Sequence, residues 1–504
     1  MKQHHRSISL SLASLLLAAS VISCGSDSTT ATTQEPAENT APVTTEAVTE
    51  GFSTEYDIPE VDYGGETFTI AAMQGIVSLW RAVNYCEIFS EGENGDPLND
   101  AIYQRNRKIE ETLNVKIECY PMDNFGESSG KIRALIQSAE DVVDIALLHA
   151  DGLPKLLGTG GLTDLYMLPN VDFTHTWWDQ NAVAELTILD KMFAVTGDIS
   201  LYLNYAPITY FFNKKLVSEL ALDDPYQLVR DGKWTLDSVI KLCTETAADL
   251  NGDGAMNETD DRYGMLSEVN SLTYAVHAAG VSLTDKDADG LPVLNVDVDR
   301  ATAVTDLFAP FMSDLNVNLI NSKVKGSYNN PFTDLFLPMF TENRALFYNN
   351  QLLVALNLRD MEADFGILPA PKLDEAQKEY ITPFNDHWGT FLIMPVTNTD
   401  YEITGHVVEA LGYWGQQLVR PAYMETTISS KALRDDASLE MLDLIFANRV
   451  YDLGSFYNWN SLDTFTAELA NNPSQKYASR YAKIEKAVQK GIEKTIEQLR
   501  AEDS

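Results

Sequence analysis

The stretch from residue 66 to residue 148 alternates between segments typical of strands and segments typical of helices, and this order constrains the fold most. The predicted order is a strand at 68–73, a helix that begins at Pro97 after the N-cap residue Asp96, a strand at 115–119, a helix at 131–139 and a strand at 142–148. The last segment is almost continuously apolar, which suits a parallel strand covered on both faces. Alternating strands and helices predict an α/β lobe with a mostly parallel sheet.

The same pattern starts again after Ala206, which predicts a second lobe. Strands are expected at 208–212, 345–348, 365–368 and 390–394, with a helix that Thr235 caps. Near the end, an apolar stripe with helical spacing comprises Tyr481, Ile484, Val488, Ile492, Ile496 and Leu499. No repeat of fixed period is present, which argues against solenoids and propellers. We therefore expect an α/β fold of two lobes, each a mostly parallel sheet flanked by helices.

Residues 1–23 have the features of a secretory signal peptide: a basic start, a short apolar run and the small residue Ser23 before Cys24. The apolar run is too short for a helix that spans a bilayer. Its end resembles the lipobox of bacterial lipoproteins, in which the cysteine is lipidated; the alternative is an ordinary secretory signal with a chance cysteine. Residues 24–60 are poor in large apolar side chains, which predicts a disordered tether. We expect the folded part outside the cytoplasm, anchored to the cell membrane through Cys24.

The chain is strongly acidic, with a formal net charge of -38 that becomes -40 when Lys2 and Arg6 are removed with the signal. Surfaces that bind nucleic acid are basic, because they neutralise phosphates. The charge therefore argues against nucleic acid and against anionic lipid as partners.

Beyond Cys24 the chain has only Cys86, Cys119 and Cys243. Three cysteines leave at least one unpaired, so a full disulfide framework is excluded. Cys86 and Cys119 could form one bridge, but Cys119 alternates with apolar residues on an expected strand face. This position favours buried free thiols.

Several catalytic signatures are absent from the sequence. It contains no HExxH and no Walker A lysine, and the glycine run at 158–161 lacks the third glycine of a dinucleotide fingerprint. The sequence does not exclude the paired carboxylates of a glycosidase, because its 74 acidic residues offer many candidate pairs. We predict no catalytic residue and expect a protein that is not an enzyme.

The loop at 249–260 has the pattern of a calcium site. Its expected ligands are Asp249, Asn251, Asp253, Asn257 and Asp260. Calcium takes about six to eight hard oxygen ligands, and the glycine at the sixth position permits the sharp turn. The last position holds Asp rather than the longer Glu, so the alternative is an acidic turn without metal. The sequence predicts a structural Ca2+ here, whereas the similar run at 285–290 is predicted to be a hairpin loop.

Aromatic residues stand beside acids and amides at several expected loops, as with Trp388 near Asp386 and Tyr348 near Asn349. The C–H faces of sugar rings lie against aromatic rings, while acids and amides bind sugar hydroxyls. Core packing is the alternative, and we expect it for about half of these aromatic residues.

Segments in residues 66–500 match one protein family in order and spacing. They are Tyr210 to Val217, Gly232 to Asp237, Asp249 to Gly254, Asp261 to Gly264, and a late block with Lys431, Arg434, Asp435 and Glu440 to Ile445. In these segments the chain resembles the bacterial extracellular solute-binding proteins of family 1, the receptors of sugar-type ABC importers. The resemblance implies two lobes that close on a ligand by a hinge motion, without covalent chemistry. It also implies permease subunits and a cytoplasmic ATPase as partners.

The resemblance places ligand-binding residues on loops, and implies His149, Asp151, Tyr205, Tyr348, Asn349, Asp386, Trp388 and Trp459. It divides the chain into lobe 1, at 61–204 and 391–450, and lobe 2, at 205–390 and 451–504. The expected function is capture of a small solute, an oligosaccharide, by a monomeric lipoprotein for delivery to an ABC permease. A surface-anchored carbohydrate-processing enzyme and an adhesin are the alternatives.

Overall fold

The computed structural model describes residues 56–73, 76–78, 81–83, 86–122, 125–359, 361–385, 389–428 and 435–501. The predicted signal peptide, the lipidated Cys24 and most of the tether lie outside the described residues. So do two of the expected ligand-binding residues, Asp386 and Trp388.

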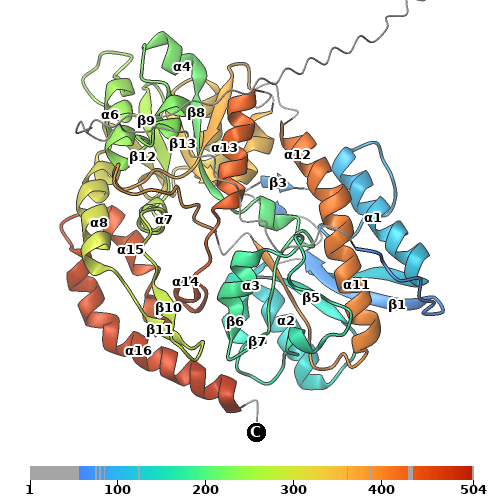
Figure 1. Ribbon diagram of the computed structural model, residues 1–504. Helices are drawn as coiled ribbons and strands as arrows, with labels where there is room; N and C mark the ends of the chain where they lie inside the picture. Colours follow the sequence, from blue (N-terminus) through green and yellow to red (C-terminus); the bar gives the residue numbers. More distant parts are fainter. Residues whose placement is uncertain are drawn as a thin grey trace, which may run out of the picture. The chain divides into compact units, whose positions relative to one another are not determined.

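The first sheet has the strand order β15-β5-β1-β4, with β1 at Glu66–Met73, β4 at Val115–Met122, β5 at Ile145–His149 and β15 at Thr390–Ile393. Figure 1 labels β1 and β5 of this sheet. β1 runs parallel to both β4 and β5, while β15 pairs with β5 in the antiparallel sense. All three strands expected before residue 150 are confirmed. Their apolar side chains face both ways, since Phe68 and Ile70 belong to a different core cluster from Ala71 and Met73.

Helices cover both faces of this sheet. α1 (Pro97–Leu113) and α11 (Tyr401–Trp414) contact each other and share one cluster with Phe68, whereas Ile132 of α2 (Phe125–Ser138) belongs to the other. The expected start of α1 is confirmed, because the Asp96 carboxylate accepts hydrogen bonds from the backbone N–H groups of Leu98 and Asn99.

The second sheet has the order β12-β9-β13-β8-β14, with β8 at Ile208–Asn213, β9 at Tyr263–Ser267, β12 at Asn318–Ile320, β13 at Ala345–Gln351 and β14 at Phe365–Leu368. β9 is parallel to β12 and β13, but β8 is antiparallel to β13 and β14. This sheet therefore contains more antiparallel pairing than expected. β8 enters from the first sheet and runs opposite to both of its neighbours, β13 and β14. The α/β class and the two separate sheets are as predicted.

Further elements complete the chain. The helices are α3 (Gln180–Leu186), α4 (Lys214–Glu219), α5 (Pro225–Arg230), α6 (Leu236–Thr246), α7 (Ser271–Ala278), α8 (Val298–Ser313), α9 (Asn321–Val324), α10 (Leu337–Thr341), α12 (Arg420–Ile428), α13 (Asp436–Ala447), α14 (Leu453–Tyr457), α15 (Phe465–Asn471) and α16 (Tyr477–Ala501). The short strand pairs are β2 (Ile76–Ser78) with β3 (Arg81–Val83), β6 (Thr187–Ile188) with β7 (Lys191–Met192), and β10 (Thr284–Lys286) with β11 (Pro292–Leu294). The β10–β11 pair confirms the hairpin expected at 285–290.

The C-terminal part of the chain packs mainly on elements that follow the second sheet's strands. α15 and α16 contact α8, and α13 contacts β14. Within the stretch 391–450, α11 thus belongs to the first sheet and α13 to the second; the exact lobe boundaries stay a prediction.

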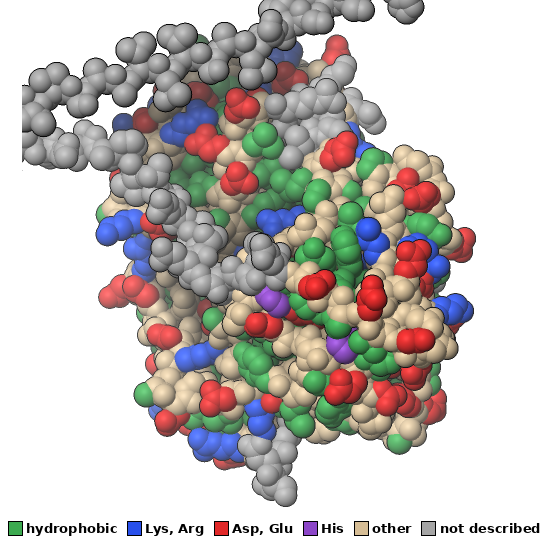
Figure 2. All heavy atoms as spheres, turned by 45° about the vertical axis from the view of Figure 1, so that its right-hand side comes forward, with side chains coloured by type: hydrophobic (Ala, Val, Ile, Leu, Met, Phe, Trp, Pro, Cys, Tyr) green, Lys and Arg blue, Asp and Glu red, His purple; other side chains and the backbone are tan. Residues whose placement is uncertain are grey.

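None of the helices in the described ranges combines the length and the apolar character needed to cross a membrane. Figure 2 shows acidic side chains spread over one face of the molecule rather than gathered in a single patch.

Two chain connections join the sheets and pair with each other. Pro207 and Phe384 form an antiparallel bridge, and the Asn385 N–H donates to the Ala206 carbonyl at 3.2 Å. The Ile208 N–H donates to the Pro383 carbonyl at 3.0 Å. The paired connections are the natural place for a hinge between the sheets.

A buried carboxylate in the segment before α1 contacts residues that flank both connections. Glu87 is fully buried, and its Oε2 accepts hydrogen bonds from Ser200 Oγ at 3.2 Å and from Thr390 Oγ1 at 2.8 Å. Burial raises the pKa of Glu87 to about 7, although the hydrogen bond from Thr390 opposes the rise.

Candidate functional site

A cavity of about 290 Å³ lies between a short 3-10 helix, Ala150–Lys155, and the helices α7 and α14. Asp151, Pro154 and Lys155 line it from the side of the first sheet. The remaining lining residues are Asn270, Thr273, Tyr274, Asn385, Ser455, Phe456, Tyr457, Asn458, Asp463 and Thr464. Residues that are far apart in sequence therefore converge on one small space.

The fold explains why the cavity is found here. The 3-10 helix follows β5 directly, and α7 begins four residues after β9 ends at Ser267. Both β5 and β9 have parallel neighbours, and open α/β sheets bind ligands beyond the carboxyl ends of such strands. Asn385 adds a contribution from the connection between the sheets.

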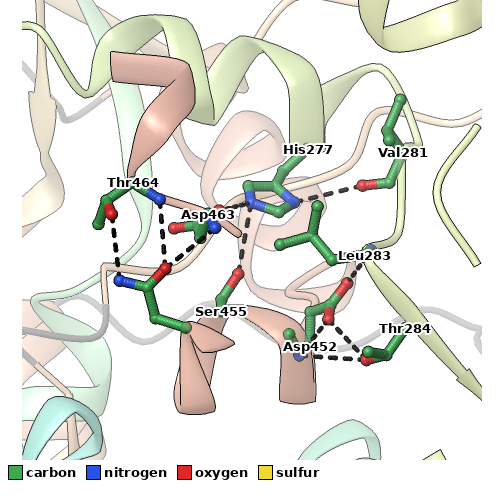
Figure 3. Close-up of polar contacts among 10 residues, drawn as sticks. His277, Val281, Leu283, Thr284, Asp452, Ser455, Asp463 and Thr464 are labelled. Atoms are coloured by element: carbon green, nitrogen blue, oxygen red, sulfur yellow. Dashed lines mark hydrogen bonds and ion pairs between the residues drawn. The ribbon is translucent and has the colours of Figure 1, made fainter. Parts of the chain in front are cut away.

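Asp452 fixes α14, which supplies three lining residues. Its carboxylate accepts hydrogen bonds from the Leu283 N–H at 2.6 Å, the Thr284 hydroxyl at 2.8 Å and the Gly454 N–H at 2.7 Å (Figure 3). Burial raises the pKa of Asp452, while the nearby His277 opposes that rise. The start of α14 is thus attached to the chain just before the β10–β11 hairpin.

His277, at the end of α7, holds Asp463 at the cavity wall. Its Nε2 lies 2.7 Å from Asp463 Oδ1, and its Nδ1 lies 3.3 Å from the Val281 carbonyl oxygen (Figure 3). A carboxylate and a carbonyl only accept hydrogen bonds, so each ring nitrogen of His277 faces an acceptor.

Ser455 Oγ is also near this ring, 3.4 Å from the same Nε2. In a serine triad the acid and the serine contact opposite ring nitrogens. Here both contact Nε2, so these three residues do not have the geometry of a triad.

Asn458 shapes the turn that presents Asp463. It has a left-handed backbone with φ of 41°, a conformation that Asn adopts more readily than most residues. Its Oδ1 accepts hydrogen bonds from the N–H groups of Asp463 at 3.0 Å and Thr464 at 3.4 Å.

Tyr457 provides an aromatic ring on the same wall. Its ring stacks on Trp459, with centroids 4.5 Å apart and planes inclined by only 4°. Trp459 in turn donates from Nε1 to Thr495 Oγ1 of α16 at 3.0 Å. The predicted residue Trp459 therefore supports the Tyr457 ring and does not itself line the cavity.

Of the other predicted ligand-binding residues, some line the cavity and others do not. Asp151 lines the cavity, as expected from its place after the third strand. Asp386 and Trp388 follow the lining residue Asn385 but lie outside the described residues.

His149 and Tyr205 are buried beside the cavity's supporting elements. His149 ends β5 and stacks with Tyr202 at 6.4 Å, while Tyr205 packs against Tyr202 and Tyr423. Neither belongs to the cavity lining, and a role in binding stays a prediction.

Tyr348 and Asn349 lie within β13, because this strand extends to Gln351 and not only to the expected end at 348. Tyr348 packs against Phe336 and Phe340, and Asn349 Nδ2 donates to the Thr209 carbonyl at 3.0 Å. Both side chains are buried in the second lobe rather than exposed on a loop.

Sequence reasoning missed the walls made by α7 and α14. It did not predict β9, a short apolar strand whose carboxyl end leads to Asn270, Thr273 and Tyr274. Recognising Tyr263–Ser267 as a strand would have placed these residues at the ligand-binding edge.

In the predicted calcium loop, acidic side chains accept hydrogen bonds from the loop's own backbone N–H groups. The Asp249 carboxylate accepts hydrogen bonds from the N–H groups of Gly252 at 2.6 Å and Gly254 at 2.8 Å. The buried Asp261 closes the loop by accepting from the N–H groups of Leu250 and Asn257, and the role of Asp260 as a calcium ligand stays a prediction. Over the described ranges, no group of three or more His, Cys, Asp or Glu side chains is placed to hold a metal. The loop's oxygen donors are of the type calcium takes, and calcium binding stays a prediction.

Comparison with solved structures identifies the fold. A cyclo/maltodextrin-binding protein complexed with maltotetraose has a TM-score of 0.56 at 12% identity, over 85% of this chain and 97% of that one. UgpB from Mycobacterium tuberculosis, in complex with glycerophosphocholine, has a TM-score of 0.55 at 13% identity, over 86% and 99%. The maltose/maltodextrin-binding domain MalE from Bdellovibrio bacteriovorus, bound to maltotriose, has a TM-score of 0.54 at 14% identity, over 86% and 100%.

No family model and no curated protein matches the sequence. The structural likeness extends over most of the described chain and over nearly the whole length of each of these proteins. The chain therefore has the two-lobed fold of the solute-binding proteins that serve ABC transporters.

Proposed function

We propose that this protein captures an oligosaccharide outside the cytoplasm and delivers it to the permease of an ABC importer. The observation that carries the proposal is the cavity at the carboxyl ends of β5 and β9, with walls from both sides of the hinge. Its volume of about 290 Å³ is at the lower end for small-molecule sites, which suits one or two sugar rings at a time.

The chemistry of the walls favours a neutral, hydroxyl-rich ligand. Carboxylates and amides can bind hydroxyl groups, while the rings of Tyr274 and Tyr457 offer flat apolar surfaces. Thr273 Oγ1 is buried at this wall and has no hydrogen-bond partner among the described residues. A ligand hydroxyl would satisfy it.

The charges at the cavity argue against an anion. Asp151 and Asp463 outnumber the single cation, Lys155. Excess negative charge disfavours a phosphate group, so the glycerophosphocholine bound by UgpB is a less suitable ligand for this cavity than the maltotriose bound by MalE.

A thermal-shift screen followed by titration calorimetry tests this proposal. Maltotriose and maltotetraose serve as sugar probes, with glycerophosphocholine, a peptide and a polyamine as other classes. A ligand that binds only the folded state raises its Tm. We expect a rise with a sugar and no sugar hydrolysis products; a rise only with another class would refute the sugar assignment, and turnover would indicate an enzyme.

We further propose that lipid on Cys24 holds the protein at the membrane, since residues 1–24 have the order of a lipoprotein signal. Cys24→Ala is then expected to move the protein from the membrane fraction to the soluble extracytoplasmic fraction. A variant that stays with the membrane would contradict lipid anchoring.

A further inference from the structure

Two thiols from different parts of the first lobe lie next to each other. Cys86 precedes α1 and Cys119 lies in β4, yet their Sγ atoms are only 3.9 Å apart. Both thiols are free and half-buried. A disulfide bond is about 2.05 Å long, so the sulfur atoms need to approach by about 2 Å, within the reach of side-chain rotation.

A small reagent can reach both thiols. Cys86 and Cys119 line a cavity of about 600 Å³, together with polar residues of the segment 90–94. Cys243, in contrast, is fully buried in α6.

The backbone next to Cys86 is held firmly. The buried guanidinium of Arg105 donates to the carbonyl oxygens of Glu87 at 3.2 Å and Ile88 at 3.0 Å. Asn106 Nδ2 donates to the same Ile88 oxygen at 2.7 Å. The Cys86 thiol is therefore kept opposite Cys119 and is not free to move away with a loose loop.

The surroundings shift the pKa values of the two thiols in opposite directions. The hydrogen bond shared with Cys119, the N–H groups of Ile88 and Phe89, and the charge of Arg105 lower the pKa of Cys86, against the effect of burial. The same hydrogen bond and burial raise the pKa of Cys119. Glu87, the next residue along the chain, interacts with both Cys86 and Arg105, and Glu91 and Glu93 line the same cavity as the thiols. Cys86 is thus the better nucleophile near neutral pH.

We propose that Cys86 and Cys119 form a reversible disulfide when the protein meets a disulfide donor outside the cytoplasm. The Cys86 thiolate attacks one sulfur of the donor, which forms a mixed disulfide and releases one donor thiolate. Cys119 then loses its proton to solvent and attacks the Cys86 sulfur, which releases the second donor thiolate. The pair loses two electrons and two protons, and the donor disulfide is reduced to two thiols.

The bridge would connect the segment before α1 to β4 across 33 positions of sequence. Because Glu87 is the neighbour of Cys86 and binds Ser200 and Thr390, the bridge also constrains the residues that support the hinge. A crosslink restricts the unfolded chain, so the oxidised protein is expected to have the higher Tm.

The test uses the full chain with Cys24→Ala, which leaves three cysteines. The protein is incubated with oxidised glutathione, and free thiols are counted with a chromogenic disulfide reagent in denaturant. We expect the count to fall from three to one, a mass loss of two hydrogens, and a crosslinked peptide pair that contains Cys86 and Cys119. The rate should rise between pH 6 and pH 8, because the thiolate fraction of Cys86 rises with pH.

Two variants separate the bridge from simple thiol modification. Cys119→Ser should retain one glutathione on Cys86, because no second thiol can displace it. Cys86→Ser should react at least tenfold more slowly. Retention of three free thiols in the parent protein under conditions that modify Cys119→Ser, or glutathione on both cysteines, would overturn the proposal. The result does not depend on which solute the protein binds.

Discussion

Glu87 predicts a specific pH dependence of stability. Its carboxylate is fully buried among Ser200, Thr390 and the backbone of Tyr202, and burial raises its pKa from 4.5 to about 7. Between these two values the folded protein retains a proton that the unfolded chain has released. The contribution of Glu87 to stability is therefore fully present below pH 4.5 and is lost as the pH rises through 7.

The size of the effect follows from the pKa difference. About 2.5 pKa units at about 1.4 kcal/mol each correspond to about 3 kcal/mol of unfolding free energy. Glu87→Gln provides a neutral group of the same shape at all pH values, and its amide oxygen can accept the same hydrogen bonds. We expect this variant to match the wild type at pH 4.5 and to be more stable by up to about 3 kcal/mol at pH 8.5.

Urea unfolding of both proteins at intervals from pH 4.5 to 8.5 measures this difference. Other partly buried acids also titrate, since burial raises the pKa of Asp144 to about 6 and that of Glu185 to about 7. Their effects cancel in the difference between variant and wild type. Glu140→Gln, at an exposed position, is the control and should give no such trend. A difference for Glu87→Gln that does not change with pH would refute the reasoning.

Further predictions concern single contacts. Thr235→Ala removes one half of the capping box of α6 and should lower the unfolding free energy by about 1 kcal/mol in urea titrations. Gly405→Ala would place a Cβ against a backbone carbonyl oxygen and should lower the unfolding free energy by about 1–3 kcal/mol. Gly92→Ala, with open space around the glycine, should lower it far less, and equal Tm values of the two variants would contradict this. If calcium binds the loop at 249–260, calcium should raise the wild-type Tm; Asp253→Ala should abolish that rise while Asp289→Ala retains it, and a wild-type Tm unchanged by chelation would exclude the metal.

The strands of the first sheet were predictable because each is a short apolar run bounded by helix or turn signals. β5 and β1 are covered on both faces, and their apolar residues already indicate this burial in the sequence. The end of β13 was not predictable in this way. Asn349, Asn350 and Gln351 are poor strand formers, yet they continue the ladder because they pair with Tyr210, Thr209 and Ile208 of β8.

The candidate site was harder to predict than the fold, because its walls come from segments that only the tertiary structure brings together. Asp151 could be found, since it directly follows a recognisable strand. Tyr457 and Asp463 could not, because their positions depend on contacts of Asp452, Asn458 and His277 with distant residues. Trp459 was a reasonable expectation by residue type, but its ring faces α16 and Tyr457 rather than the cavity.

The most direct test of the proposed function is titration calorimetry of the wild type with maltotetraose and maltotriose, repeated with Tyr457→Ala and Asp151→Ala. Asp289→Ala, on the exposed β10–β11 loop, serves as the control. The account predicts saturable binding of a sugar by the wild type and the control. For each cavity variant it predicts an affinity that is weaker by about tenfold or more. This corresponds to a binding free energy that is less favourable by about 1.4 kcal/mol or more. Sugar binding that is equally strong in all four proteins, or absent from a wild type that binds another class of solute, would contradict it.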